Sequence, residues 1–568
     1  MRPLIMRACA QLVLVVLASQ PRQSQPSLVF VLPVDFAARS GMAATPRAQG
    51  FLHTVFGAQL DGSGTATNAD SILAPLKMSG YRGREAIGGN AHLGRLGVTD
   101  IQLVLSDFWG YGCSNNSGSC ARGIWPPLTK SGLAAPGICC EWPGNGGDWS
   151  RLEAVIANAS DWVKQAPNPI KWDIWNEPDS WGIFWHNGGE ANFFELWRHA
   201  VQAIRSHDPN AQIVGPSFSR SYGCDTPVGP CSGGMGADGQ WDPSSPNGTW
   251  DGSACAGVPP VTGVADKLCG LSPAHNTTMR RFLKFAQEEE VLPDWLSWHE
   301  WSPGLKFLPD HVADVLSYLK ATPEVRLRGI SINEAFREDD YLKPAGHVAA
   351  FANVEAAARR AAPLPVTLIK TNMGRGILDG SVIGRQTAST WNLSASGQLR
   401  GIYHTQVGYA NLSGELLSLP PMSMSSSGSD DGVGIAALAS INNMTQTAQL
   451  LLGLYEDASA KHWTNGTQLP THLEVKLSNV PAGILDAAGK LHATIATIPD
   501  TEHPSQRTVF PGPVVSHVVI APTSESSGAA VFLLRLAVPD DGGYCAVKPA
   551  MALVHRCMPA WSVELRAS

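Results

Sequence analysis

The stretch IKWDIWNEPDSWGIFW, residues 170–185, decides the fold of this chain. Its first six residues are β-branched and aromatic types with one Lys and one Asp, a composition that predicts a buried strand. Pro178 cannot continue a central strand, because it has no N–H group to donate to a neighbouring strand. Glu177 is therefore predicted to lie at the C-terminal end of a strand.

The residues around Glu177 favour sugar chemistry. Asn176 precedes it, and the rings of Trp175, Trp181 and Trp185 are close in sequence. Aromatic faces can stack on a pyranose and exclude water, and exclusion of water raises the pKa of a carboxyl group toward the range of a general acid. The competing interpretation is a solvated glutamate in a turn, because short motifs also occur by chance.

Trp175-Asn176-Glu177-Pro178 resembles the acid/base motif of the retaining glycoside hydrolases of clan A. This resemblance implies a (β/α)8 barrel with Glu177 at the end of strand four and a second glutamate, the nucleophile, at the end of strand seven. The stretch Val325–Phe336 supplies the candidate, Glu334. The alternative for Glu334 is an ordinary acidic residue in the first turn of a helix.

A third stretch, Trp295–Ser302, resembles strand six of glycoside hydrolase family 39, the β-xylosidases and α-L-iduronidases, in which a histidine lies beside the sugar. The resemblance implies substrate contacts for His299 and Trp301; without it, His299 would be interpreted as a core histidine. Trp391 loosely resembles the sugar-platform tryptophan of the clan. Strand eight is therefore expected to end near it, with residues 401–419 closing the barrel.

Alternating strand and helix patterns predict a parallel α/β barrel over residues 27–421. The resemblance to family 39 implies that residues 27–49 could instead add a strand to the second domain. Residues 422–434 are rich in Ser, Gly and Asp, as in a linker. Alternating apolar runs then predict an antiparallel β-sandwich over residues 430–568. The predicted barrel strands include Thr54–Ala58, Ile101–Asp107 and Gln212–Pro216.

Composition limits the class of protein. A chain of 568 residues exceeds one core, since single cores stop growing near roughly 250–300 residues. Hydrophobic residues make up 44% and charged residues 16%, which is globular usage. The net charge of −7 is spread without runs, so nucleic acid is not an expected partner.

The N-terminus has the layout of a secretory signal peptide over residues 1–26, with Arg2 and Arg7 before an apolar run that is too short to span a bilayer. A membrane anchor is the rival interpretation. Removing this segment leaves ten of eleven cysteines, an even number that predicts five disulfides and an oxidising compartment. Eight Asn-x-Ser/Thr sequons agree with a secreted glycoprotein.

The combined prediction is a secreted retaining glycosidase without a metal or cofactor, exo-acting on β-xyloside-like or related glycosides. Fifteen of the eighteen tryptophans fall between Trp109 and Trp301, which favours a carbohydrate substrate. Arg328 and Arg337 leave uronic acids open as substrates. Two alternatives remain at this point: an endo-acting glycanase of the same clan, and a barrel that binds carbohydrate without catalysis. The sequence does not predict the sugar, the anomer or the oligomeric state.

Overall fold

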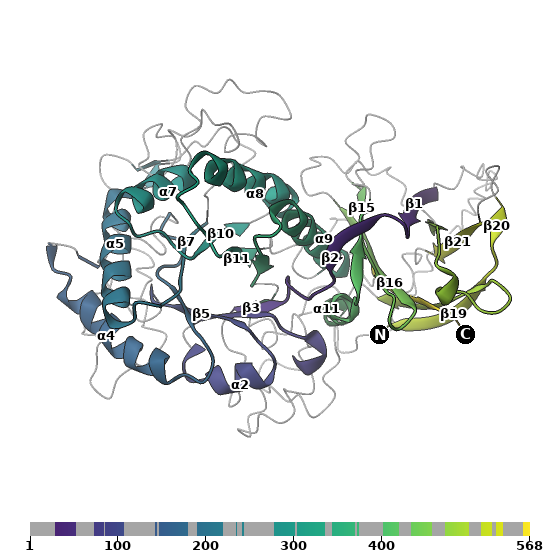
Figure 1. Cartoon of the computed structure of the whole chain (residues 1–568), viewed down its shortest axis with the longest axis horizontal. Coiled ribbons are helices and arrows are strands. Elements are labelled where there is room, and N and C mark those ends of the chain that lie inside the picture. Colours follow the sequence, from purple (N-terminus) through teal and green to yellow (C-terminus); the bar gives the residue numbers. More distant parts are fainter. Residues whose placement is uncertain are drawn as a thin grey trace, which may run out of the picture.

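The structure of the chain is a computed structural model. It describes residues 29–52, 73–83, 86–106, 143–144, 147–179, 190–219, 234–235, 241–242, 278–300, 304–335, 343–369, 372–373, 401–419, 433–456, 472–498, 513–524, 530–537 and 560–567. These residues form two units, a parallel barrel and an antiparallel sandwich (Figure 1).

The first unit is a parallel β/α barrel, as predicted from the resemblance. Each strand pairs in parallel with the next, and helices surround the sheet (Figure 1). In barrel order the strands are β3 (Gly50–Leu52), β4 (Gly80–Arg82), β5 (Asp100–Val104), β6 (Lys171–Asp173), β7 (Ile213–Phe218), β10 (Trp295–Glu300), β11 (Gly329–Ala335) and the divided strand β12 (Val366–Leu368) with β13 (Asn372–Met373).

The eighth strand is divided into two short pieces that close the barrel. β12 pairs with β11, and β13 pairs with the first strand, β3. The prediction that strand eight ends near Trp391 is therefore wrong. Residues 401–419 are not a closing segment either, since they contain a helix and one strand of the second unit. Only three residues of β12 carry a strand pattern, too few for sequence periodicity to detect.

Helices follow the strands in the alternating order that the sequence predicts. In α4, for example, Leu152, Val155, Ile156 and Ala159 recur at helical spacing and are buried against the sheet. The helices are α2 (Asn90–Arg95), α4 (Ser150–Gln165), α5 (Glu190–His207), α7 (Thr278–Glu288), α8 (Gly304–Ala321), α9 (Pro344–Ala361) and α11 (Gly401–Asn411), with a 3-10 turn, η2 (Ala74–Leu76).

The inside of the barrel is polar, whereas the apolar core lies between the sheet and the helices. On β6, Trp172 belongs to that apolar core, while the next residue, Asp173, bonds to side chains from β4, β7 and β11. Successive strand residues point to opposite faces, so Asp173 faces the lumen. The single Asp within an aromatic strand therefore marks the interior of the barrel.

The second unit is the predicted sandwich, whose strands pair antiparallel except for β1, which pairs in parallel with β17. One sheet has the order β1-β17-β21-β20 and the other the order β19-β18-β22-β16-β15-β14-β2, and a shared apolar core lies between them. Their bounds are β1 (Val29–Asp35), β2 (Arg39–Ala43), β14 (Glu415–Leu417), β15 (Val433–Asn442), β16 (Thr447–Glu456), β17 (His472–Ser478), β18 (Leu491–Ile498), β19 (Val514–Ile520), β20 (Thr523–Ser524), β21 (Ala530–Ala537) and β22 (Ala560–Arg566). A separate two-stranded sheet joins β8 (Gly234–Met235) to β9 (Trp241–Asp242), and a 3-10 turn, η7, spans Ala482–Ile484.

The sandwich packs directly on the barrel through α9 and α11 (Figure 1). A side-chain carbon at Gly453 of β16 would come within 2.9 Å of the Cα of Ala345, so this position requires glycine for the close approach of α9. Leu451 contacts the barrel core, whereas Leu450 and Leu452 belong to the sandwich core. β16 is therefore buried on both faces, which explains its continuous apolar run.

The features that predict secretion are only partly within the described residues. The segment 1–26 and all eleven cysteines lie outside them. Three sequon asparagines, Asn158, Asn411 and Asn443, are described and exposed. No described helix combines the length and apolar character needed to cross a bilayer.

Candidate active site

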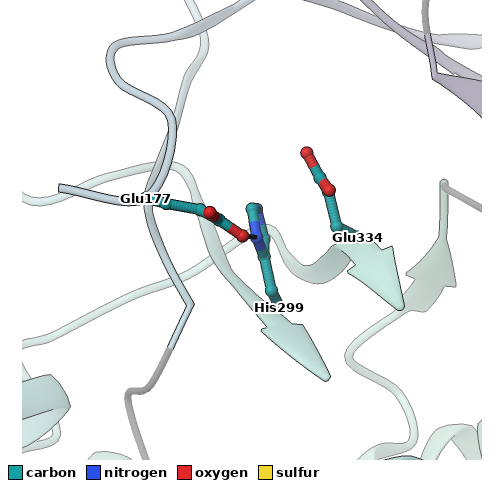
Figure 2. A group of neighbouring side chains, drawn as sticks. All are labelled: Glu177, His299 and Glu334. Atoms are coloured by element: carbon teal, nitrogen blue, oxygen red, sulfur yellow. Dashed lines mark hydrogen bonds and ion pairs between the residues drawn. The ribbon is translucent and has the colours of Figure 1, made fainter. Parts of the chain in front are cut away.

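Glu177, His299 and Glu334 meet at the C-terminal ends of the barrel strands. One donor atom from each lies within 4.8 Å of the other two. Figure 2 shows His299 and Glu334 at the ends of neighbouring strands, with Glu177 opposite on a connecting segment. All three are buried, with 6%, 3% and 6% of their surfaces exposed. The fold therefore brings these three residues together.

Glu177 lies in a strained turn after β6. Its φ of 43° is in the left-handed region, and so is the φ of 57° at Ser217 on β7. The Glu177 N–H donates to the Ser217 carbonyl oxygen at 3.1 Å, so the two strained residues support each other. Asp179 accepts hydrogen bonds from the N–H and hydroxyl of Ser219 at 2.7 and 3.1 Å. Such strain, about 1–3 kcal/mol a residue, clusters at active sites.

His299 makes a direct side-chain hydrogen bond with Glu177. The distance from His299 Nδ1 to Glu177 Oε1 is 2.7 Å (Figure 2). The pairing of β10 with β11 shifts register between Trp298 and His299, and such bulges redirect side chains near active sites. Glu300 Oε1 accepts from Trp298 Nε1 at 2.6 Å and lies 2.7 Å from His311 Nδ1, which fixes the end of β10 to α8.

Glu334 is held by an arginine that the sequence analysis did not single out. Arg82 Nη1, from the end of β4, donates to Glu334 Oε1 at 2.7 Å. Arg82 Nε donates to Asp173 Oδ2 at 2.5 Å, so one guanidinium joins two carboxylates. Both bonds are charge-assisted and lie in a buried setting, where such contacts are strong. The two glutamates therefore have different partners, a histidine for Glu177 and a guanidinium for Glu334.

The three clustered residues offer a donor set that could in principle hold a divalent metal. Their existing contacts fit proton transfer better. His299 already shares a hydrogen bond with Glu177, and the guanidinium of Arg82 already supplies positive charge at Glu334. A metal would have to compete with both interactions, so the arrangement does not require one.

The other predicted site residues divide into two groups. Asn176 lies beside Glu177, and its N–H donates to Ser106 Oγ at 3.2 Å. Its side-chain Oδ1 has no hydrogen-bond partner within the described part of the chain. Trp175 is 3% exposed and packs in the barrel core. The remaining predicted site residues, Trp181, Trp301 and Trp391, lie outside the described residues, as does Trp185.

Four residues of the site were missed by the sequence analysis: Arg82, Asp173, Ser217 and Asn333. Arg82 ends the strand Gly-Tyr-Arg and Asp173 the strand Lys-Trp-Asp, and a charged residue in a short buried strand needs a buried partner. That local pattern could have identified both. Ser217 and Asn333 carry no comparable sequence pattern, because serine and asparagine are common at strand ends.

Arg328 lies at the opposite end of the barrel. It precedes β11, and its Nε is 3.1 Å from Asp294 Oδ1. Its backbone N–H donates to the Asp294 carbonyl oxygen at 2.7 Å. Because Glu334 is at the other end of β11, Arg328 cannot contact a sugar bound at the glutamates. The suggestion that Arg328 binds a uronic acid is therefore wrong, and Arg337 lies outside the described residues.

Solved structures share the fold of most of the chain at low sequence identity. A structure of N2152 from Neocallimastix frontalis matches with a TM-score of 0.56 and 16% identity, over 95% of this chain and 100% of that one. A glucosidase from Croceicoccus marinus matches with a TM-score of 0.51 and 11% identity, over 95% and 99%. No protein-family model matches the chain, and no curated protein matches it in sequence. These comparisons show the fold alone.

Proposed function

We propose that this protein is a retaining glycoside hydrolase of clan A. The observation that supports this most is the separation of the two buried glutamates, whose donor atoms lie within 4.8 Å of each other. Retaining enzymes have their two carboxyl groups about 5–5.5 Å apart, whereas inverting enzymes need ~6.5–9.5 Å to admit a water molecule. The fold shared with a protein described as a glucosidase is consistent with this proposal.

In the first step, Glu334 is the nucleophile. A carboxylate oxygen of Glu334 bonds to the anomeric carbon as the bond from that carbon to the leaving oxygen breaks. Glu177 gives its proton to the leaving oxygen, which departs as an alcohol. Arg82, 2.7 Å from Glu334 Oε1, orients the attacking carboxylate. The Oδ1 of Asn176 beside Glu177 can accept a hydrogen bond from a sugar hydroxyl.

In the second step, water replaces Glu334. Glu177, now ionised, takes a proton from the water, whose oxygen bonds to the anomeric carbon as the ester bond to Glu334 breaks. His299 can serve Glu177 in both states. Its Nδ1 accepts from the protonated acid or donates to the carboxylate, depending on which tautomer is present. Two inversions at one carbon give net retention.

The finer proposal is exo action on β-xyloside-like or related glycosides. It is supported by the resemblance of the strand-six stretch to family 39, including His299, which bonds Glu177 in the fold. An endo-acting glycanase would instead release internal fragments from a polysaccharide. The presence of both carboxyl groups at reacting distance argues against a barrel that only binds carbohydrate.

A panel of aryl glycosides of differing sugar and anomer tests the proposal. We expect hydrolysis of at least one, with the released sugar first appearing in the anomeric form of the substrate when followed by NMR. Initial release of the opposite anomer would overturn the retaining mechanism. Product sizes from linear oligosaccharides distinguish single-residue release from internal cleavage.

We also propose that the mature protein is secreted with ten cysteines in five disulfides. The layout of residues 1–26 and the even cysteine number support this. Thiol titration of the unfolded, unreduced protein secreted by a eukaryotic host should find almost no free thiol. Several free thiols in that sample would contradict the proposal.

A further inference from the structure

Asp173 is a further buried carboxyl group of the barrel lumen, and its hydrogen bonds join it to the surroundings of both candidate catalytic glutamates. It is fully buried in the lumen, at the end of β6. Its Oδ2 accepts from Arg82 Nε at 2.5 Å and from Asn333 Nδ2 at 3.1 Å. Its Oδ1 accepts from Ser217 Oγ at 2.8 Å. Three different barrel strands therefore converge on this one carboxyl group.

One branch of these contacts leads to the nucleophile. Arg82 uses Nε for Asp173 and Nη1 for Glu334, and because a guanidinium is planar, fixing one edge fixes the direction of the other N–H groups. Asn333, which precedes Glu334 on β11, is held by Asp173 as well. The position of the Glu334 carboxylate therefore depends on Asp173 through both its partner and its backbone.

The other branch leads to the acid/base. Asp173 binds the hydroxyl of Ser217, and the carbonyl oxygen of the same Ser217 accepts the N–H of Glu177 at 3.1 Å. Ser217 and Glu177 both have left-handed φ values, a conformation that surrounding contacts must maintain. Asn333 Nδ2 also donates to Ser217 Oγ at 2.7 Å, which joins the two branches.

We propose that Asp173 is a positioning residue that sets the two glutamates at their reacting separation, through Arg82 for Glu334 and through Ser217 for Glu177. This inference rests on the proposed glycosidase function. Burial raises the pKa of the Asp173 carboxyl group, and the charge of Arg82 opposes that shift. A carboxyl group whose burial disfavours its ionised form lowers stability, and such groups are found where they serve the geometry of a functional site.

The test is Asp173→Asn with Asp100→Asn as matched control. An amide at position 173 keeps the shape but replaces one accepting oxygen with a donor, which opposes either Ser217 or the pair Arg82 and Asn333. We expect kcat to fall about 100-fold, the scale of an approximately 1 Å misplacement, with KM little changed. Asp100 is a buried lumen carboxylate too, but its partner is Lys171 at the far end of the barrel. Its amide variant should keep the wild-type kcat.

A further variant tests the branch toward Glu177 separately, and it keeps the proposal testable if Asp173→Asn does not fold. Ser217→Ala removes the hydroxyl that bonds Asp173, Asn333 and Ser297, but it leaves Arg82 between Asp173 and Glu334. Its loss should therefore be larger for poor leaving groups, which need the acid, than for activated aryl glycosides. If Asp173→Asn fails to fold, this leaving-group dependence in Ser217→Ala decides the matter, and equal loss on both substrate types overturns the proposal. Folded Asp173→Asn with wild-type kcat also overturns it. An inactive wild-type protein would instead refute the glycosidase function.

Discussion

The barrel lumen holds two buried ionic networks, one at each end, and they are built differently. At the N-terminal ends of the strands, Lys171 Nζ lies 2.9 Å from Asp100 Oδ1 and 3.3 Å from the ring centroid of Trp295. Gln102 Nε2 and Thr367 Oγ1 donate to the same carboxylate at 3.2 and 3.3 Å. One buried cation, Lys171, therefore faces one buried anion, Asp100. Gln102 and Thr367 give the carboxylate further hydrogen bonds, and the ring of Trp295 lies against the ammonium group.

At the C-terminal ends, one guanidinium faces several carboxyl groups. Arg82 contacts Asp173 and Glu334, and Glu177 is within 4.8 Å of Glu334. Buried like charges oppose folding, so this end is less favourable for stability than the balanced pair at the other end. In β/α barrels the C-terminal end carries the chemistry and the N-terminal end contributes stability, and the two networks follow that division.

The largest effect is expected for Glu334→Ala. Loss of the nucleophile should lower kcat on the order of 10⁶-fold, as for removal of a nucleophile from other enzymes with covalent intermediates. Stability should hold, because Arg82 keeps Asp173 and one of the crowded carboxylates is gone. Hydrolysis rates and thermal unfolding check both parts. Glu288→Ala, at an exposed helix position, is the control and should keep wild-type activity. If Glu334→Ala also retained activity, Glu334 would not be the nucleophile.

Glu177→Ala should have the next largest effect. Rates on alkyl glycosides should fall about 10²–10⁴-fold, because their leaving groups need a proton from the acid. Activated aryl glycosides, whose leaving groups depart as stable anions, should lose far less in the first step. The measurement is kcat/KM for a series of leaving groups. An equal loss across the series would contradict the acid/base role.

Lys171→Met tests the other end of the barrel. It leaves the buried Asp100 carboxylate without its cation, which should lower the free energy of unfolding by about 3–5 kcal/mol. The kcat of the folded fraction should not change, since Lys171 is remote from the glutamates. Denaturant titration and kinetics measure the two quantities. The double variant Asp100→Leu with Lys171→Met should recover much of the lost stability. A large drop in the kcat of folded Lys171→Met would contradict the view that the N-terminal end of the barrel contributes only stability.

The smallest effect concerns the pH dependence of stability. Burial raises the pKa of Asp173 in the folded protein above its unfolded value of about 3.9. The folded state then binds the proton more tightly, so this group's contribution is fully present below pH ~3.9 and is lost as pH rises through the folded pKa. Asp173→Asn cannot ionise. The Tm of Asp173→Asn relative to that of the wild type should therefore increase as pH rises above about 4. A Tm difference that does not change with pH would contradict a raised pKa at Asp173.

The two candidate catalytic glutamates could be found from the sequence because the residues that end a strand are close to it in sequence. Proline after an aromatic and β-branched run predicted that strand four ends near Glu177, and β6 ends at Asp173, shortly before it. The run before Glu334 predicted strand seven, which is β11. The supporting residues were harder to find. Arg82 is the last residue of a strand of only three residues, and its two carboxylate partners are 91 and 252 positions away.

The sequence by itself was enough to predict a barrel with a sandwich and to single out Glu177, His299 and Glu334 as candidate site residues, because periodicity, strand endings and short motifs are local properties. The tertiary structure alone decided how the barrel closes through the divided eighth strand and how β1 joins β17 across the chain. It also decided that Asp173 supports both glutamates. These contacts join residues far apart in sequence, and a side chain's partners depend on which strands the closed barrel brings together.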